Sequence, residues 1–302
     1  MASAVYGAPP PALVSIPKYA RQVSPLVPGA DVLEDAPDCS LDAIAVAAPP
    51  GAIERRYVLA QALRALKPGG ELTAVAPKDK GGMRLRKELA AFGCAVSEQS
   101  LRHQRLCACL RPVAAIGLAE AIAEGGAQTP PRLGLVSQPG VFSWDRPDPG
   151  SQLLAKHLGG VAGEGADLGC GVGLLALSVL ASPKATALTL VDVDRRAIQA
   201  ARRNIADPRA RFLQADLREP TPSLADLDFV VMNPPFHDGG EEDRGLGQAF
   251  IRQAAAMMRR GGVLRLVANI GLPYEATLAA AFDQARRLEQ GGGYKVLEAR
   301  RV

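Results

Sequence analysis

The sequence is poor in aromatic residues and has little excess charge of either sign. Phenylalanine, tryptophan and tyrosine together make up 4% of the 302 residues, too few for a broad stacking platform that binds single-stranded nucleic acid. The formal net charge is +4, and the basic excess is spread over both halves of the chain. Net charge therefore gives no argument for nucleic-acid binding, and the hydrophobic content of 48% is typical of a globular protein.

Long apolar runs and paired cysteines are also missing. No stretch approaches the roughly 20 apolar residues that cross a bilayer, and the Pro- and Ala-rich residues 1–28 do not resemble a signal peptide. The five cysteines are an odd number without a Cys-x-x-Cys pair, so we expect reduced thiols and no metal site. From these absences we expect a cytosolic protein with neither a membrane nor a metal partner.

The length leaves room for two domains, and strand-like and helix-like segments alternate in two series. Expected strands are 41–46, 71–76, 106–110, one ending at 167, 187–191, 211–214, 229–232, 263–267 and 294–299. Expected helices are 53–66, 82–92, 151–158 with Ser151 as its cap, 174–180, 195–204, 247–259 and 275–282. Residues 1–30, with six prolines, are expected to be irregular, and 123–150 to form a linker. The alternation predicts helix-covered parallel α/β sheets in two domains, 1–130 and 131–302.

Two short pieces of the first series recur in the second. The stretch that begins Leu66-Lys-Pro-Gly-Gly matches the one that begins Met258-Arg-Arg-Gly-Gly, 192 positions later. The stretch from Leu41 to Pro49 likewise matches Leu227 to Pro235, 186 positions later. Two similar offsets in the same order predict that the first domain is a diverged copy of the second.

A glycine-rich stretch, Asp167-Leu-Gly-Cys-Gly-Val-Gly173, lies between an expected strand and an expected helix. Its glycines, Gly169, Gly171 and Gly173, let the backbone approach a ligand closely, and the helix N-terminus favours an anionic group. A dinucleotide fingerprint would have Gly or Ala at position 174, where this chain has leucine. The stretch instead resembles motif I of class I S-adenosylmethionine (SAM) methyltransferases. Taken alone, it leaves both cofactors and a turn without a ligand open.

Two further carboxylates follow strands of the second series. Asp192 ends its strand about twenty residues after the glycines, where a carboxylate can accept both ribose hydroxyls of an adenosine. A helix cap is the alternative role, and Asp194 fits it better. Asp216, after the next strand, is a candidate for the adenine edge or simply a turn residue. We assign Asp167, the three glycines, Asp192 and Asp216 to the cofactor.

The sequence Asn233-Pro-Pro-Phe236 ends the strand over 229–232. An amino nitrogen conjugated to a ring is a poor nucleophile because its lone pair is delocalised. The Asn233 side-chain oxygen and the Pro234 carbonyl can accept its two N–H groups and so turn the lone pair toward a methyl donor. Pro234 and Pro235 fix the turn, and Phe236 offers a face on which a base can stack. These four residues are therefore our candidates for the catalytic group, against the alternative of an Asn-Pro turn with a packed Phe.

The seven residues from Asn233 to Gly239 resemble the signature of the small-subunit ribosomal RNA guanine-N2 methyltransferases. The stretches that agree further are Pro139-Gly-Val-Phe-Ser143, Asp148-Pro-Gly-Ser-Gln-Leu-Leu154, Val267-Ala-Asn269, Leu272-Pro-Tyr274 and Tyr294-Lys-Val296. The resemblance implies two tandem Rossmann-like class I methyltransferase domains, of which the N-terminal one has lost its cofactor site. Consistent with that division, Ala47-Ala-Pro49 replaces Asn-Pro-Pro in the first domain and offers no side-chain amide.

The resemblance also implies the reaction, which is methylation of the exocyclic N2 amine of a guanine in ribosomal RNA, most often 16S, with SAM as cofactor. The partner is then ribosomal RNA or the small ribosomal subunit, and we expect a monomer. We assign His237 and Phe142 to the base, and Lys78 and Lys80, at an expected strand end, to RNA docking. Adenine N6, protein glutamine N5, a non-catalytic RNA-binding assembly factor and, more distantly, a dehydrogenase are the alternatives.

Overall fold

The computed structural model describes residues 2–221, 223–235, 237–238, 241–242 and 244–302. By its internal contacts the chain divides into two compact units, unit 1 (Met1–Ala127) and unit 2 (Gln128–Val302), each with its own sheet and hydrophobic core. No helix among the described residues combines the length and apolar character that a membrane span requires.

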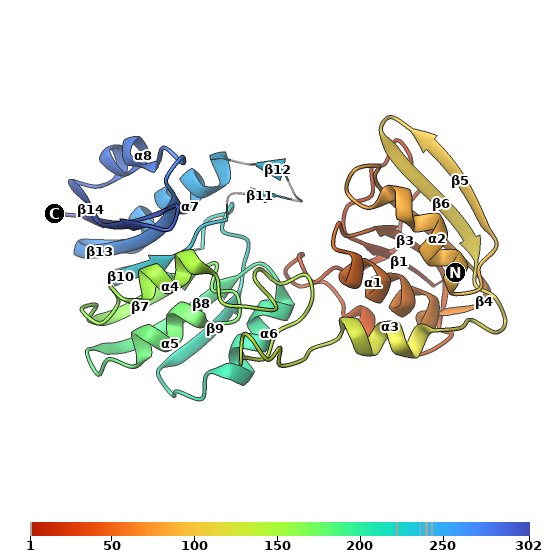
Figure 1. Ribbon diagram of the computed structural model, residues 1–302, viewed down its shortest axis with the longest axis horizontal. Coiled ribbons are helices and arrows are strands. Elements are labelled where there is room, and N and C mark those ends of the chain that lie inside the picture. Colours follow the sequence, from red (N-terminus) through yellow and green to blue (C-terminus); the bar gives the residue numbers. More distant parts are fainter. Residues whose placement is uncertain (1, 222, 236, 239–240, 243) are drawn as a thin grey trace. The chain divides into compact units, whose positions relative to one another are not determined.

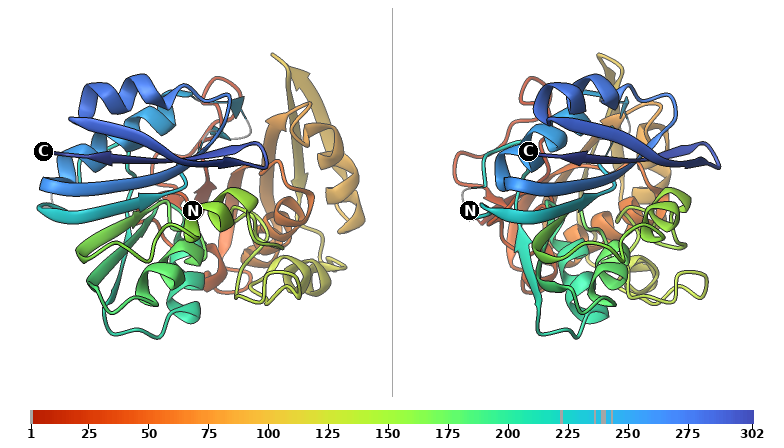
Figure 2. Two further views of the ribbon diagram at one scale, coloured as in Figure 1. Left: turned by 60° about the vertical axis from the view of Figure 1, so that its left-hand side comes forward. Right: turned by 90° about the vertical axis from the view of Figure 1, so that its left-hand side faces the viewer.

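Unit 2 is built on a seven-stranded sheet in the order β14-β15-β13-β10-β7-β8-β9. The strands are β7 (Gly163–Leu168), β8 (Ala185–Asp192), β9 (Ala210–Gln214), β10 (Leu227–Met232), β13 (Met258–Asn269), β14 (Gln284–Gly291) and β15 (Tyr294–Arg300). The first five named are mutually parallel, and the hairpin of β14 and β15 adds an antiparallel edge, drawn dark blue in Figure 2. A separate short pair, β11 (His237–Asp238) and β12 (Glu241–Glu242), follows β10.

Helices cover both faces of this sheet (Figure 1). They are α4 (Pro149–Ala155), α5 (Leu174–Leu180), α6 (Arg195–Asn204), α7 (Arg244–Met257) and α8 (Tyr274–Ala281). Strand β10 shows how the two cores form, because alternate side chains point to opposite faces. Phe229 and Val231 pack with α4, α5 and α6, whereas Val230 and Met232 pack with α7 and α8.

The weak strand signal before Asp167 has a steric explanation. Strand β7 is an interior strand of the sheet, between β10 and β8, even though glycine disfavours strands. A Cβ atom built on Gly165 would lie 2.4 Å from the ring of Phe229, and one on Gly163 would overlap the Asp228 carboxylate. The neighbouring strand therefore occupies the space that larger β7 side chains would need, and propensity alone underestimates this strand.

Unit 1 has a six-stranded sheet in the order β2-β1-β3-β4-β6-β5. Its elements are β1 (Ser3–Tyr6), β2 (Arg21–Gln22), η1 (Leu33–Asp35), β3 (Leu41–Ala47), α1 (Ala52–Ala65), β4 (Leu66–Pro77), η2 (Gly82–Arg84), α2 (Leu85–Ala91), β5 (Val96–Leu101), β6 (Gln104–Leu110) and α3 (Leu118–Gly125). The prediction that residues 1–30 are irregular is wrong for β1, which is fully buried and pairs with both β2 and β3. Strand β1 has only four residues, too few to show the hydrophobic alternation of a strand, and the prolines that follow it indicate irregular structure.

The two units share one topology, which confirms the predicted repeat. Read from the antiparallel edge, the first six strands of unit 2 run β14-β15-β13-β10-β7-β8 and the six of unit 1 run β5-β6-β4-β3-β1-β2, while β9 is a seventh strand of unit 2. Helices α1 and α7 have 14 residues each, strands β4 and β13 have 12 each, and both pairs are offset by 192 positions. The fold is therefore two tandem α/β domains of one design, as predicted. The described residues of unit 1 form no counterparts of α5 and α6, and residues 13–20 pack against that face instead.

The equivalence also locates what unit 1 has lost. The pairing of β1 with β3 and of β7 with β10 aligns Val5 with Asp167 and Gly7 with Gly169. Both glycines have φ of +72°, but Gly7 is followed by Ala-Pro-Pro-Pro where unit 2 continues Cys-Gly-Val-Gly. Unit 1 therefore retains the strand and its first turn without the carboxylate or the glycines that follow.

The predicted linker over 123–150 is only partly correct. Helix α3 extends to Gly125, and Gln128 forms a bridge with Ser137. Leu133, Leu135 and Trp144 then pack with Val141 and with side chains of α6. Their spacing has neither the helical nor the strand period, so sequence patterns gave no sign that this segment belongs to the core of unit 2.

Candidate functional site

The carboxyl ends of the parallel strands β8, β7 and β10 lie side by side at one edge of the sheet in unit 2. Leu168 pairs with Val191 on one side and with Met232 on the other, so the segments that follow all three strands meet at this edge. Ligands of open α/β sheets bind at this edge. A pocket here is lined by Leu133, Phe142, Ser143, Arg146, Pro147, Asp148, Ser151, Gly169, Cys170, Gly171, Val172, Leu174, Leu175 and Asn233.

The predicted glycine-rich loop forms one wall of the pocket. Gly169, Gly171 and Gly173 all have positive φ, at +72°, +52° and +91°, which other residues rarely adopt. A Cβ on Gly173 would lie 2.7 Å from Ile205, whereas one on Gly171 would meet no atom within 4 Å. Gly173 is thus favoured by its left-handed backbone conformation as well as by its close neighbour, while Gly171 presents bare backbone to the open part of the pocket.

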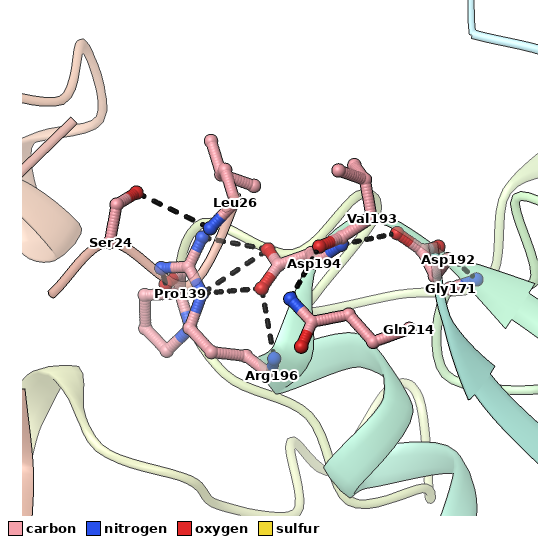
Figure 3. Close-up of polar contacts among 9 residues, drawn as sticks. All are labelled: Ser24, Leu26, Pro139, Gly171, Asp192, Val193, Asp194, Arg196 and Gln214. Atoms are coloured by element: carbon pink, nitrogen blue, oxygen red, sulfur yellow. Dashed lines mark hydrogen bonds and ion pairs between the residues drawn. The ribbon is translucent and has the colours of Figure 1, made fainter. Parts of the chain in front are cut away.

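Asp192 holds the loop in place. Its Oδ2 accepts a hydrogen bond from the Gly171 backbone N–H at 2.9 Å, and its Oδ1 accepts one from the Asp194 N–H at 2.9 Å (Figure 3). Burial raises the pKa of Asp192 to about 6, against the opposing effect of these N–H donors. The alternative cap role belongs to Asp194, as expected, because its Oδ1 accepts from the Arg196 N–H at the start of α6.

Asp167 lies beneath the same loop and is fully buried. Neither carboxylate oxygen has a hydrogen-bond partner of normal geometry among the described residues. Burial, followed by the charge of Asp192, raises its pKa to about 8, and the nearby Ala176 N–H opposes that shift. A buried carboxyl group without a partner is costly unless a bound group supplies a donor or a positive charge.

Two side chains of α6 fasten the preceding segment over the loop. Asn204 Nδ2 donates to the carbonyls of Val136 and Val172, at 2.9 and 3.0 Å, and its Oδ1 accepts from the Val136 N–H at 2.8 Å. Arg196 is buried against Asp194 and donates to the Pro139 carbonyl at 3.5 Å (Figure 3). Residues 133–144 are thereby fixed beside the pocket rather than forming a free linker.

Asn233 follows β10 and faces the loop at the opposite wall. Its side-chain Nδ2 donates to Asp148 Oδ2 at 3.0 Å and to Ser151 Oγ at 2.9 Å. Its backbone oxygen would lie 4.0 Å from a Cβ on Gly169, as would Pro235 Cδ. The predicted catalytic turn and the predicted cofactor loop are thus in direct proximity.

The prediction that Ser151 caps the following helix is wrong. Helix α4 begins at Pro149, and its cap is Asp148, whose Oδ2 accepts from the Ser151 N–H at 2.7 Å. Proline is favoured at the first helical position because its missing N–H would have no partner there. The helix therefore starts two residues earlier than expected and leaves the Ser151 hydroxyl available to Asn233.

The other predicted site residues have varied surroundings. Phe142 lines the pocket with 60% of its surface exposed. Asp216 forms an ion pair with Arg218 at 2.7 Å, which holds its pKa below the usual range, and it does not line the pocket. Phe236 lies outside the described residues, and only the backbone of His237 is described, in β11. Lys78 and Lys80 follow β4 in unit 1.

Sequence reasoning missed the polar residues that position the site. Asp148, Ser151 and Asn204 were given no part in it, although an Asp-Pro-Gly-Ser run is a readable helix start. Nothing local indicates that Asp148 contacts a residue 85 positions away. Among the described residues, no cluster of three or more His, Cys, Asp or Glu side chains suits a metal ion, and all five cysteines are free.

Comparisons with known proteins agree with this geometry. Residues 132–298 match the family described as Methyltransferase small domain. The chain is 37% identical over 257 residues to a Ribosomal RNA small subunit methyltransferase C of Pseudomonas paraeruginosa, covering 81% of this chain and 75% of that protein. The protein of that name from Shewanella loihica is 30% identical over 270 residues, with 87% and 78% covered.

A solved structure resembles the whole chain. It is the T. thermophilus 16S rRNA N2 methyltransferase in complex with AdoMet and guanosine, with a TM-score of 0.81 and 27% identity. The match covers 100% of this chain and 88% of that one, so both units have counterparts there. Together with the relatives above 30% identity, this shows that the chain belongs to the ribosomal RNA small subunit methyltransferase C family.

Proposed function

We propose that this protein transfers the methyl group of SAM to the exocyclic N2 amine of a guanine in 16S ribosomal RNA. The observation that carries the proposal is the Asn233 carboxamide, held at the end of β10 beside the glycine loop in unit 2. The relatives that share the fold are named for ribosomal RNA methylation, and the solved structure contains AdoMet and guanosine.

The residues of the pocket fit SAM. The cofactor supplies an electrophilic methyl group on a positively charged sulfonium, and it carries an ammonium group as well. Asp167 is a buried carboxyl group without a hydrogen-bond partner of normal geometry in the described part of the chain, and the open space over Gly171 admits a ligand against bare backbone. We assign Asp192, at the end of β8, to the ribose hydroxyls, because a carboxylate at this strand end is the usual acceptor for them. Asp167 and Asp192 do not line the pocket themselves but adjoin its glycine loop, and nearby carboxylates stabilise the positive charge that the ligand brings.

The chemical task of Asn233 is to orient and polarise the amine. The two N–H groups of guanine N2 are donors, and acceptors aimed at them turn the nitrogen lone pair toward the electrophile. The side-chain oxygen of Asn233 and the carbonyl of Pro234 are those acceptors. Positive charge develops on N2 during attack, and fixed acceptors stabilise it without reorganisation. Catalysis therefore rests on position and polarisation, with the extra proton of N2 released after transfer.

The base must leave its stack to reach the pocket, so an unpaired or flipped guanine is the substrate form. Phe142 is a largely exposed aromatic side chain on the pocket wall, which suits stacking against a base. Phe236 and His237 follow the Asn-Pro-Pro turn directly in sequence and remain assigned to the base on that ground.

Unit 1 does not carry out the reaction and serves as a scaffold and an RNA-docking domain. Its topology matches unit 2, but Val5 stands at the position of Asp167 and Ala47 at that of Asn233. Lys78 and Lys80 follow β4 at its carboxyl end, the edge at which open α/β sheets bind ligands. We assign the scaffold and RNA-docking role to residues 1–130 and catalysis to residues 131–302. We expect a monomer that acts on the ribosomal RNA of the small subunit.

The decisive test is incubation with isotope-labelled SAM and unmodified ribosomal RNA, followed by digestion and nucleoside mass analysis. N2-methylguanosine in the 16S fraction is the expected product. N6-methyladenosine, or label in a protein glutamine, would replace the proposed substrate. SAM binding without turnover on either RNA or subunits would instead indicate a non-catalytic assembly factor, and selective binding of NAD would indicate a dehydrogenase.

A further inference from the structure

We propose that Asp148 and Ser151 are positioning residues that set the orientation and polarity of the Asn233 carboxamide. The inference rests on the proposed function, because Asn233 must be the acceptor of the guanine amine for its orientation to matter. It extends that function to two residues on another element, the start of helix α4.

The contacts form a closed network of three residues. Asp148 Oδ2 accepts from Asn233 Nδ2 at 3.0 Å and from the Ser151 backbone N–H at 2.7 Å. Ser151 Oγ lies 2.9 Å from the same Nδ2, and Ser151 is only 7% exposed. Both hydrogens of the Asn233 amide are thus directed to acceptors on α4. All three residues line the pocket together with Gly169 and Gly171.

The network decides which way the carboxamide faces. An ionised carboxylate has acceptors only, so the atom of Asn233 that contacts Asp148 must be the nitrogen. With both hydrogens of that nitrogen engaged, the side-chain oxygen lies on the opposite side of the amide. No described residue donates a hydrogen bond to that oxygen, which leaves it available to an amine. A flipped amide would present N–H groups to a donor and would repel the substrate.

The charge of Asp148 also acts through the amide. A carboxylate that accepts hydrogen bonds from the NH₂ group of a carboxamide polarises the amide and increases the negative charge on its oxygen. That oxygen faces the guanine nitrogen while the nitrogen becomes positive in the transition state. The interaction is therefore stronger in the transition state than in the ground state, so it raises kcat rather than substrate affinity.

The backbone around Asp148 is held firmly enough for this task. Asp148 caps α4, so its carboxylate is fixed by the helix that it starts. A Cβ on Gly150 would lie 2.8 Å from the Tyr294 ring, so helix α4 is packed closely against β15 at this point. Asp148 in turn raises the pKa of the Tyr294 hydroxyl, after the larger effect of burial.

The test uses the full-length protein, with Asp148→Asn as the main variant. Asparagine caps a helix as well as aspartate does, so α4 keeps its start while the charge and the acceptor-only character are lost. We expect kcat on ribosomal RNA to fall roughly 10- to 100-fold, with KM for RNA and the Kd of SAM almost unchanged. Ser151→Ala removes one neutral acceptor and should lower kcat roughly 2- to 10-fold.

The double variant Asp148→Asn with Asn233→Ala shows whether Asp148 acts through Asn233. If it does, the double variant has the kcat of Asn233→Ala alone, within about twofold. Multiplied effects, or an equal loss of SAM affinity in Asp148→Asn, would overturn the proposal and assign Asp148 to the cofactor. An unchanged kcat in Asp148→Asn would overturn it as well.

Asp145→Asn is the matched control. It removes the same charge three residues away in the same segment, and Asp145 does not line the pocket. It should retain the wild-type kcat. Formation of N2-methylguanosine by the wild type separates the proposed function from the positioning role. If the wild type forms none, the proposed function is refuted. If the wild type and Asp148→Asn are equally active, only the positioning role of Asp148 is refuted.

Discussion

The Asn233 carboxamide lies where binding and chemistry can be separated by measurement. It contacts Asp148 and Ser151 and borders the cofactor loop, yet it supplies no side-chain bond to that loop. Asn233→Ala should therefore leave SAM affinity almost intact and lower turnover by roughly 10²- to 10³-fold, the range for losing one group that stabilises a transition state. Calorimetric titration with SAM and single-turnover kinetics measure the two quantities. Equal losses in both would contradict the assigned role.

Asp192 should behave in the opposite way. Its carboxylate accepts the backbone N–H of Gly171 and of Asp194, so it shapes the loop as well as facing the proposed ribose. Asp192→Ala is expected to weaken SAM binding first, with kcat at saturating SAM much less affected. A variant that binds SAM normally but turns over slowly would move Asp192 from the cofactor to the chemistry.

If the buried Asp167 acts on the cofactor as proposed, SAM binding should depend on pH. Its pKa in the free protein is about 8, so the group is largely protonated at neutral pH, and a bound cation favours the ionised form. Binding then releases a proton, and SAM affinity should rise with pH up to about 8 and level off above it. Asp167→Asn should reduce this rise and the affinity on the plateau. The quantity to measure is the difference in the pH dependence of SAM affinity between the wild type and Asp167→Asn. Titration of SAM itself and of Asp192 contributes equally to both proteins and cancels in that difference.

The same carboxyl group lowers the stability of the ligand-free protein at neutral pH. Its pKa is raised from 3.8 to about 8, so the folded state binds more protons than the unfolded state between these values. The contribution to stability is therefore present at acidic pH and declines as pH rises toward 8. Asp167→Asn should raise the Tm of the free protein at pH 8 more than at pH 4 and should lessen the rise in Tm that SAM produces.

At the scale of elements, helix α1 of unit 1 shows how the degenerate copy is stabilised. Arg55 is 1% exposed, and its guanidinium contacts both oxygens of Glu88 at 2.8 Å. It also donates to the carbonyls of Pro49 and Pro50, at 3.1 and 2.8 Å, just after β3. In unit 1, the turn that corresponds to the Asn-Pro-Pro turn of unit 2 is thus occupied by a buried ion pair rather than by a site for an amine.

Arg55→Ala should lower the free energy of unfolding of unit 1 by about 3–5 kcal/mol, since it leaves the Glu88 carboxylate, which is only 11% exposed, without Arg55. Urea denaturation monitors this change, and SAM affinity should stay at the wild-type value. Arg56→Ala is the control one residue along, because its ion pair with Glu124 is exposed and should contribute less than about 1 kcal/mol. If the two variants unfold alike, the buried pair has no special role.

Elements whose pattern is set by their own residues were predictable from the sequence. Helices over 174–180 and 195–204 match the expectation. The repeat was recognisable because β4 and β13 begin with similar residues, including a Gly-Gly pair. Elements defined by their neighbours were missed. Strand β1 is identifiable only from its pairing with β2 and β3, and the edge strands β5 and β14 are too polar to show a buried face.

The same distinction applies to the site. The glycines and Asn233 are local motifs, and the structure places them together at one sheet edge in unit 2. Asp148, Ser151 and Asn204 act through side-chain hydrogen bonds to residues 32 to 85 positions away in the sequence. No period or spacing encodes such a contact, so these residues emerge only when the fold brings their elements together.

At the scale of the whole molecule, we propose that the duplicated fold separates RNA recognition from the reaction. Unit 2 retains the carboxylate, the glycines and the carboxamide that the chemistry needs, and unit 1 retains the sheet without them. Unit 1 still has a sheet edge formed by the carboxyl ends of its strands, and Lys78 and Lys80 follow β4 there. On the proposed division of roles, we expect unit 1 to contribute affinity for RNA.

Replacing both lysines tests this division. In Lys78→Gln with Lys80→Gln, RNA affinity should fall, and the slope of log affinity against log salt should decrease by about 0.7 for each lost contact with a single-stranded phosphate. SAM affinity should not change, because the cofactor pocket belongs to unit 2. Arg203→Gln removes an exposed charge from α6 and serves as the control with an unaltered slope. A double-lysine variant with the wild-type salt dependence would show that this edge of unit 1 carries solvated charge and does not bind RNA.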